Sequence, residues 1–208
     1  MALDYEQQFY SKDIKLIVGC DEAGRGCLLG DVFAGAVILA RDFSCDLIND
    51  SKQLTEKQRE QAFLIIKEKA IAWGVGRCSV EEIDKLNIYN ASRLAMERAI
   101  ENMNHSFDMI ITDAMSMKRK DNIPVIPLIH GDALSQCIAA ASIIAKVSRD
   151  HYCLELDKQY PEYQIAKHKG YGTKIHLEAL EKYGPKKGLH RFTYKPVKKY
   201  LLEKISLF

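Results

Sequence analysis

The sequence predicts an α/β protein in which a mixed sheet of about five strands is flanked by helices. Short apolar runs alternate with longer stretches that carry helix-capping patterns. Only a glycine-rich join separates the first two apolar runs, which favours an antiparallel pair, whereas helical stretches separate later strands. The 208 residues are enough for one large domain with a substantial core.

Two strands are expected near the N-terminus. The first apolar run, Lys15–Cys20, ends at Asp21, and the second covers Val32–Ala40. Glycines punctuate the sequence around their join, at positions 19, 24, 26 and 30. This pattern indicates a strand, a loop and a second strand.

Two helical stretches and a third strand follow. Thr55 is followed three residues later by glutamine, a capping-box pattern that predicts a helix ending near Ala70. Ile71–Cys78 reads as a strand. Ser79, with glutamate three residues later, repeats the capping pattern and opens a helical stretch that reaches about Met103.

The second half of the chain supplies two more strands and a long helix. Phe107–Thr112 is an apolar run that ends before Asp113, and Val125–Ile129 is another, which ends before Gly131–Asp132. The residues from Ala133 to about 160 predict a helix whose first half is rich in small side chains. These elements complete the order β, β, α, β, α, β, β, α.

The C-terminal part differs in composition from the rest of the chain. From Ile165 to the end, 11 Lys or Arg stand against 3 Glu, whereas the remaining chain carries 19 against 25 acidic residues. We therefore expect a single domain over 1–208, with a core at about 13–160 and a basic, helical appendage at about 161–208. A basic appendage beside an acidic body fits a protein that binds phosphates with one part and metal with another, although charge alone favours a solvated, lysine-rich terminal helix.

Composition excludes several other classes. The net charge is +2, 47% of the residues are hydrophobic, and no apolar run approaches the roughly 20 residues that span a bilayer. Residues 1–12 contain Asp4 and Glu6 and no signal-peptide pattern, so we expect a cytoplasmic protein. The six cysteines form no C-x-x-C pair, which predicts free thiols and not a zinc or redox site.

Four acidic residues stand where the predicted elements begin or end: Asp21, Glu22, Asp113 and Asp132. Side chains at neighbouring strand ends of an α/β sheet converge even when they are distant in sequence. Gathered carboxylates repel one another unless a cation neutralises them, and oxygen ligands without His or Cys favour Mg²⁺ or Mn²⁺. A pair of such ions about 4 Å apart can promote phosphodiester cleavage.

Each of these acids also has an ordinary explanation. Asp132 fits the N-cap of the helix expected from Ala133, and Asp113 fits a turn after a strand. Asp21 and Glu22 fit an exposed strand end. Spacing alone does not decide between these alternatives and a metal site.

Five sequence blocks resemble the ribonuclease HII family. They occur in the family's order over about Gly19 to Pro196: GCDEAGRGCLLG (19–30), DSKQLT (50–55), LNIYNASRLAM (86–96), GD (131–132) with IAAASIIAKVSRD (138–150), and HKGYGTK (168–174) with His190-Arg191 downstream.

The resemblance implies an RNase H-like fold with a small C-terminal helical appendage. It implies endonucleolytic hydrolysis on the 5′ side of a ribonucleotide in an RNA/DNA hybrid or in duplex DNA, leaving a 3′-hydroxyl and a 5′-phosphate, for removal of misincorporated ribonucleotides and RNA primers. It assigns the metal-ligand and catalytic positions to Asp21, Glu22, Asp113 and Asp132, with two Mn²⁺ or Mg²⁺ ions as cofactors.

The same resemblance assigns substrate contacts. The turn Gly24-Arg25-Gly26 would read the ribose 2′-hydroxyl and the adjacent phosphate through its backbone, because glycines allow close approach. Tyr171 occupies the position of the family tyrosine at the ribose–DNA junction. Candidate phosphate contacts are Lys52, Asn90, Arg93, Lys146, Arg149 and the cluster 167–174. Asp150 reads as structural, orienting Arg149 or Lys146.

The chain departs from the family pattern at four places. Cys27 replaces proline, Asp31 replaces a common proline, and His130 stands where lysine often precedes Gly-Asp. Ala114 follows Asp113 where glycine or asparagine is common. Asp31 is expected to add an acid near the carboxylate cluster, so these departures affect the expected rate and metal preference and not the reaction class.

Two rival functions and one further partner are considered. Ribonuclease HIII shares the fold but has D-E-S-G-K-G at residues 21–26 and an extra N-terminal domain; a catalytically inactive nucleic-acid-binding module would need only the basic appendage. The apolar end Ile205–Phe208 resembles tails that dock on the sliding clamp, although packing of a terminal helix explains it too. A monomer that binds hybrid or ribonucleotide-containing duplex is the default expectation.

Overall fold

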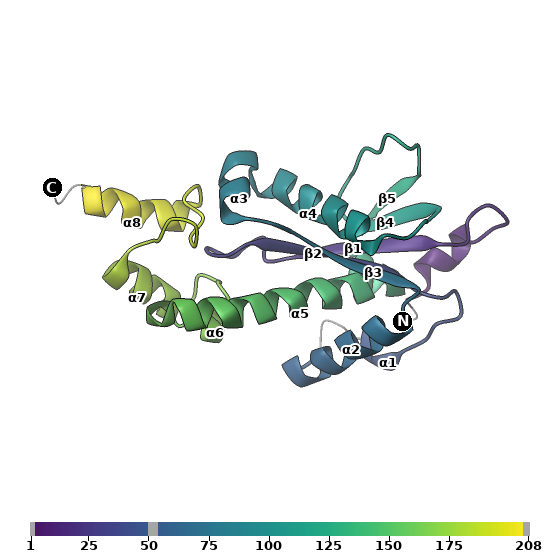
Figure 1. Cartoon of the computed structure of the whole chain (residues 1–208), viewed down its shortest axis with the longest axis horizontal. Coiled ribbons are helices and arrows are strands. Elements are labelled where there is room, and N and C mark those ends of the chain that lie inside the picture. Colours follow the sequence, from purple (N-terminus) through teal and green to yellow (C-terminus); the bar gives the residue numbers. More distant parts are fainter. Residues whose placement is uncertain (1–2, 50–53, 206–208) are drawn as a thin grey trace.

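The computed structural model describes residues 3–49 and 54–205. Within them, a five-stranded mixed sheet has the order β3-β2-β1-β4-β5 (Figure 1). The β1–β2 and β2–β3 pairs are antiparallel, and the β1–β4 and β4–β5 pairs are parallel. The predicted fold class is therefore confirmed. The strands are β1 (Ile17–Ala23), β2 (Val32–Ile38), β3 (Ala72–Cys78), β4 (Met109–Asp113) and β5 (Val125–Leu128).

The first strand is longer than the apolar pattern predicts. β1 continues through Asp21 and Glu22 to Ala23, and its last residues pair with β2, with Asp21 opposite Gly35. The expectation that these two acids follow the strand is therefore wrong. Pairing with a fully buried β2 extends β1 beyond the point at which its side chains cease to be apolar.

The helix α5 (Gln136–Gln159) covers one face of the sheet at very short range (Figure 1). A Cβ atom at Gly19 would lie 2.2 Å from the carbonyl carbon of Cys137, and one at Gly35 would lie 2.2 Å from the carbonyl oxygen of Ala141. Only glycine allows this approach. The small residues of the first half of α5 are buried there, and Asp21 lies on the same face of β1 as Gly19.

The start of α5 differs from the expectation. Gly131–Ala133 form a 3₁₀ turn, and the helix begins three residues later than predicted. The hydroxyl of Ser135 accepts the backbone N–H of Ile138 at 3.3 Å and serves as the N-cap. Asp132 is therefore not the N-cap of this helix, which removes the ordinary explanation considered for it.

The opposite face is covered by α3 (Val80–Leu86) and α4 (Ile88–Met103), whereas α2 (Glu56–Lys69) packs beside α5. Both predicted capping boxes, at Thr55 and Ser79, are formed. The single helical stretch expected after Ser79 is broken at Asn87, where φ is 68° and the side chain caps α4.

Several short elements were not predicted individually. A 3₁₀ turn (Tyr5–Phe9) and α1 (Asp46–Asn49) precede α2. After α5 come a 3₁₀ turn (Pro161–Tyr163), α6 (Ile165–His168), α7 (Lys174–Tyr183) and α8 (Lys195–Ile205). These C-terminal elements lie at the end of the sheet from which the β1–β2 loop projects (Figure 1).

The C-terminal part is joined to that loop through its main chain. The N–H groups of Leu28 and Gly30 donate to the carbonyls of Gly170 and Leu189, each at 2.8 Å, and the N–H of Arg191 donates to Leu28 at 2.9 Å. The loop that follows the acids of β1 is therefore shaped by the C-terminal residues.

All six cysteines are free thiols, as the sequence predicts, and five of them are buried. Among residues 3–49 and 54–205, no helix combines the length and the apolar character that crossing a membrane requires.

Candidate active site

Asp21 and Asp113 lie side by side at the ends of two parallel strands. In the β1–β4 pair, Cys20 stands opposite Thr112, so the next residue of each strand is an aspartate. Both side chains leave the sheet on the face that α5 covers, because they alternate with residues buried against that helix. Glu22 comes next on β1.

Burial and mutual repulsion make this carboxylate group unfavourable without a cation. Burial, together with the charges of Glu22 and Asp113, raises the pKa of Asp21 to about 8. Burial also raises the pKa of Glu22, although a hydrogen bond from the Arg25 guanidinium to its Oε1, at 3.0 Å, opposes the increase. At neutral pH the group therefore holds a proton or needs positive charge.

The Gly131–Asp132 turn is attached to the same strand end. The backbone N–H of Gly131 donates to Asp113 Oδ1 at 2.9 Å, which brings the start of the 3₁₀ turn to the end of β4. Asp132 follows immediately and is buried. Asp21, Glu22 and Asp113 thus interact electrostatically. Asp132 is the residue after Gly131, whose N–H binds Asp113.

The donor set suits a hard divalent cation. Glu22 Oε2 is buried and has no hydrogen-bond partner in the part of the chain that the structure describes. An unsatisfied carboxylate oxygen beside Asp21 and Asp113 is a site that Mg²⁺ or Mn²⁺ would satisfy. However, no three His, Cys, Asp or Glu side chains of the described residues are arranged as a finished metal site. The carboxylates are gathered at one edge, and their coordination sphere is not closed.

Two buried arginines shape the loop after β1. Arg191 is fully buried; its guanidinium donates to the carbonyl of Gly30 at 2.8 and 3.0 Å and to that of Arg25 at 2.9 Å. Arg149 donates to the carbonyls of Lys169 at 2.8 Å and of Leu29 and Asp31 at 3.4 Å. Sequence reasoning treated both as part of basic blocks. Their structural role was missed, because the sequence does not show which cations are buried.

Asp150 does not orient Arg149 as expected. Its Oδ2 lies 3.6 Å from Nη1 of Arg59 on α2, whereas the Arg149 guanidinium donates to backbone carbonyls. Asp150 is structural in a different sense, since it joins α5 to α2. Arg149 is only 3% exposed, so its assignment as a phosphate contact is not supported.

A cleft of about 560 Å³ opens beside this loop. Its walls include Gly24, Lys146 and Tyr171, three of the predicted substrate contacts, and the side chain of Tyr171 is 52% exposed. The cleft is strongly cationic, because it is also lined by Arg59, Arg149, Lys167 and Lys169. A polyanion is the ligand class that such a cleft favours.

Two other predicted contacts lie elsewhere, and a third falls outside the described residues. Asn90 and Arg93 are on α4, across the sheet from α5. The amide of Asn90 donates to the carbonyl of Leu86 at 3.1 Å, and Arg93 lies 3.7 Å from Glu97. Neither residue is among those that line the cleft. Lys52 lies outside the residues that the structure describes.

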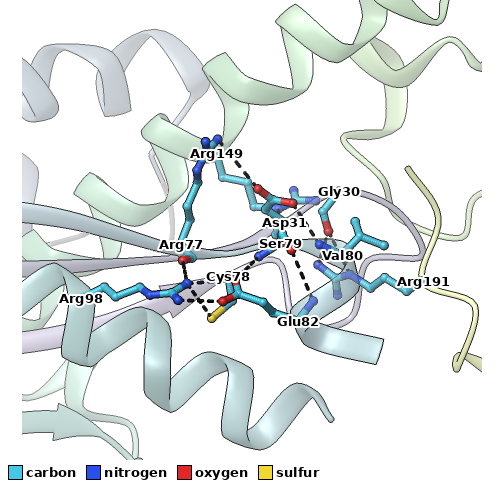
Figure 2. Close-up of polar contacts among 10 residues, drawn as sticks. All are labelled: Gly30, Asp31, Arg77, Cys78, Ser79, Val80, Glu82, Arg98, Arg149 and Arg191. Atoms are coloured by element: carbon cyan, nitrogen blue, oxygen red, sulfur yellow. Dashed lines mark hydrogen bonds and ion pairs between the residues drawn. The ribbon is translucent and has the colours of Figure 1, made fainter. Parts of the chain in front are cut away.

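The four departures have identifiable surroundings. Figure 2 shows Asp31 among Arg77, Val80 and Arg149. Its carboxylate accepts the N–H of Val80 at 3.2 Å and lies 3.8 Å from Arg77. The expectation that Asp31 adds an acid to the cluster is therefore wrong, since this carboxylate binds the start of α3 and a neighbouring cation.

Two other departures, Ala114 and His130, have a left-handed backbone conformation. Ala114 has a φ of 53° and His130 one of 58°, both in the left-handed region that glycine and asparagine adopt more easily. Glycine or asparagine after Asp113 would therefore relieve strain that alanine retains. Cys27 lies 3.6 Å from the carbonyl of Lys169, which places its thiol against the wall of the cleft.

The two glycines of the Gly24-Arg25-Gly26 turn give a matched test. Gly24 has a φ of 96°, and a Cβ there would lie 2.1 Å from Nε of Arg149. A Cβ at Gly26 would meet no heavy atom of the described residues within 4 Å. We expect Gly24→Ala to lower the free energy of unfolding by more than about 1 kcal/mol, and Gly26→Ala to leave it within about 0.5 kcal/mol.

The cleavage rate should be sensitive to Gly26→Ala, the variant that leaves stability unchanged. If the backbone at Gly26 meets the ribose, Gly26→Ala lowers kcat/KM by at least about tenfold, because a methyl group blocks close approach. Urea unfolding and steady-state cleavage of a ribonucleotide-containing duplex measure both effects. Wild-type cleavage by Gly26→Ala would contradict backbone reading at this glycine.

Known proteins with similar sequences belong to a single nuclease family. A family model described as Ribonuclease HII matches residues 18–197. The ribonuclease HII of Alkaliphilus metalliredigens is 48% identical over 198 residues, which are 92% of this chain and 96% of the relative. That of Acetivibrio thermocellus is 50% identical over 181 residues, which are 86% and 70% of the two chains.

Solved structures agree on the fold. Ribonuclease H2 from Pyrococcus horikoshii superimposes with a TM-score of 0.76 at 25% identity, covering 90% of this chain and 98% of that one. Bst-RNase HIII in complex with Mn²⁺ gives 0.68 at 18% identity, covering 92% and 71%.

Sheet order, flanking helices and these superpositions define the class of protein: a nuclease with the RNase H-like fold. The match over residues 18–197, together with relatives that are nearly half identical, is more specific. The chain belongs to the ribonuclease HII family. The resemblance found in the sequence is therefore confirmed, and the protein is a hydrolase that cleaves RNA.

Proposed function

We propose that the chain is an endoribonuclease that hydrolyses the phosphodiester on the 5′ side of a ribonucleotide in an RNA/DNA hybrid or in duplex DNA. The products would be a 3′-hydroxyl and a 5′-phosphate, and the role would be removal of misincorporated ribonucleotides and RNA primers in the cytoplasm. The observation that carries the proposal is the juxtaposition of buried Asp21 and Asp113 next to Glu22. Membership of the ribonuclease HII family supports the reaction class.

Asp21, Glu22, Asp113 and Asp132 are the residues that would hold Mn²⁺ or Mg²⁺. Two such ions supply Lewis acidity that activates a water and stabilises the leaving oxygen. The protein contributes the arrangement of the oxygens: Asp21 and Asp113 are fixed by the strand register, and the bond from Gly131 fixes the rotamer of Asp113. The Mn²⁺ complex of Bst-RNase HIII supports a divalent metal by analogy of fold.

Substrate selection is assigned to the loop and the cleft. The Gly24-Arg25-Gly26 backbone and Tyr171 would contact the ribose, and Lys146 would contact phosphate. Support comes from the open space at Gly26, the exposed ring of Tyr171 and the cationic walls of the cleft. Lys52, Asn90 and Arg93 remain candidate phosphate contacts, the latter two for a strand that reaches α4.

We further propose a monomer made of a single domain, whose appendage docks on the β1–β2 loop. Docking of the tail Ile205–Phe208 on a sliding clamp remains a candidate. Its support is an RNase HII of Archaeoglobus fulgidus, 22% identical and with a TM-score of 0.72 over 86% of this chain and 95% of that one, which was solved as a complex with PCNA. Residues 206–208 lie outside the described part of the chain.

A cleavage assay tests the proposed reaction. A DNA duplex with one embedded ribonucleotide is expected to be cut on the 5′ side of that ribonucleotide with Mn²⁺ or Mg²⁺, and not with EDTA. The same duplex without the ribonucleotide is the control. Cutting only within long hybrids would favour the ribonuclease HIII-like alternative, and no cutting with either metal would favour an inactive binding module.

A further inference from the structure

Three buried histidines lie together behind the segment that carries Tyr171: His176 and His190 share a hydrogen bond, and His168 stacks on His176. We infer that His168, His176 and His190 are positioning residues that set the direction of the Tyr171 side chain. The inference rests on the proposed contact between Tyr171 and the ribose. We name this unit, His168, His176 and His190, the histidine clamp.

The hydrogen bonds of His168 define which of its nitrogens carries the proton. Its Nδ1 accepts the backbone N–H of Gly170 at 3.0 Å. Its Nε2 lies 2.9 Å from the carbonyl oxygen of Tyr163, which can only accept. His168 is therefore neutral and protonated on Nε2.

The hydrogen bonds of the other two histidines also allow only one set of proton positions. Nδ1 of His190 accepts the N–H of Lys186 at 3.0 Å, so its Nε2 carries the proton and donates to His176 Nε2 at 3.3 Å. His176 therefore carries its proton on Nδ1, which lies 2.9 Å from the carbonyl oxygen of Tyr171. Each ring nitrogen of the histidine clamp has a partner of the required type.

The environment keeps all three rings neutral. Burial lowers the pKa of His176 to about 4 and that of His190 to about 3, and it also lowers the pKa of His168. A second proton on His168 or His190 would have to bind Nδ1, which accepts a backbone N–H. Two donors would then face each other, so protonation is unfavourable. The rings of His168 and His176 stack with centroids 4.3 Å apart and planes inclined by 10°.

The segment that the clamp holds has an unfavourable backbone conformation. Lys169 has a φ of 49° and Gly170 one of 89°, two consecutive left-handed residues, of which the first is not glycine. The histidine clamp binds this segment on both sides, at the N–H of Gly170 and at the carbonyl of Tyr171.

The exposed position of the tyrosine ring makes this support necessary. Tyr171 is half-exposed, and its side chain is hydrogen-bonded to that of Cys27, so this one contact and the main chain at 170–171 together determine where the ring points. A hydroxyl that selects ribose must be placed within hydrogen-bond distance, and a small rotation of the backbone would move it out of reach.

Substitution of His176 tests the inference. His176→Ala removes the donor to Tyr171 and is expected to lower kcat on the single-ribonucleotide duplex about tenfold. His176→Asn places an amide N–H where Nδ1–H was, and should restore kcat to within about threefold although the bond to His190 is lost. His105→Ala is the control, because His105 is exposed and its ring hydrogen-bonds to the adjacent Ser106 carbonyl at 2.7 Å, away from the histidine clamp.

Two further measurements keep the test decisive if His176→Ala fails to fold. His190→Asn retains an acceptor for the Lys186 N–H and removes only the donor to His176, so it should lower kcat less than His176→Ala does. In the wild-type protein, ¹⁵N NMR should show His176 protonated on Nδ1 and His168 and His190 protonated on Nε2. His176 protonated on Nε2 would overturn the inference.

Tyr171→Ala distinguishes this inference from the proposed function. If Tyr171→Ala leaves kcat on the single-ribonucleotide duplex unchanged, the role of Tyr171 is wrong and the inference falls with it. If Tyr171→Ala lowers kcat and a folded His176→Ala does not, only the inference is overturned. Parallel losses in the two variants, with recovery in His176→Asn, are the expected result.

Discussion

Asp113→Asn is expected to reduce kcat/KM by at least about 10³-fold while the protein remains folded. In the wild type, the N–H of Gly131 donates to Asp113 Oδ1 at 2.9 Å. The asparagine Oδ1 can still accept this bond, so the turn that carries Asp132 should stay in place. What is lost is one negative charge and one metal-binding oxygen beside Asp21. Single-turnover cleavage of the single-ribonucleotide duplex, with circular dichroism to verify folding, measures the effect.

Asp108→Asn is the matched control for this variant. Asp108 precedes the same strand, and its carboxylate also accepts backbone N–H groups, those of Lys15 and Leu16 at 2.8 and 2.9 Å. Asp108 is at the opposite end of β4 from Asp113, so the Asp108→Asn variant should cleave the duplex at the wild-type rate. Retained activity in Asp113→Asn would show that the third metal ligand has been assigned wrongly.

Arg191→Met is expected to lower the free energy of unfolding by about 3 kcal/mol or more. The substitution keeps an unbranched side chain but removes both donors to the carbonyl of Gly30 and one of the two donors to the carbonyl of Arg25, which keeps the Tyr194 hydroxyl at 2.7 Å. Hydrogen bonds to a charged group contribute about 1.5–3 kcal/mol each. For a chain of this size, the melting temperature should fall by roughly 10 °C. The single tryptophan, Trp73, gives a fluorescence signal for urea unfolding.

The control for the second prediction is Arg93→Met. Arg93 is half-exposed on α4 and lies 3.7 Å from Glu97, a surface contact, so its removal should change the free energy of unfolding by no more than about 0.5 kcal/mol. Equal stability of the two variants would show that Arg191 does not hold the loop. Arg191→Lys should be intermediate, since lysine keeps the charge and loses the planar arrangement of donors.

The sequence predicts the order of strands and long helices along the chain and both capping boxes because these depend on local patterns. The end of β1 was misplaced because it depends on pairing: Asp21 is held in the sheet by β2 and covered by α5, and neither is visible in an apolar run. The late start of α5 has the same kind of cause. Asp132 was the only cap considered from the sequence, whereas the structure uses Ser135, because the 3₁₀ turn at Gly131–Ala133 delays the helix.

For the candidate site, the acids were easier to predict than the cations. Acidic residues at strand ends follow from the pattern, and the register then places Asp21 beside Asp113. Lys146 and Arg149 lie three residues apart on one helix and both line the cleft, yet only Arg149 is buried, with its guanidinium bound to backbone carbonyls. That difference arises from the loop and the C-terminal segment that close over Arg149, which is tertiary information.

The partners of the two buried arginines bear on how this loop tolerates change in evolution. Arg149 and Arg191 bind carbonyl oxygens, which every amino acid supplies. The shape of the loop is thus specified without reference to most of the side chains it carries. Cys27 and Asp31 can therefore replace the prolines usual at these positions, and side chains at the rim of the cleft can change while the backbone of the loop keeps its conformation.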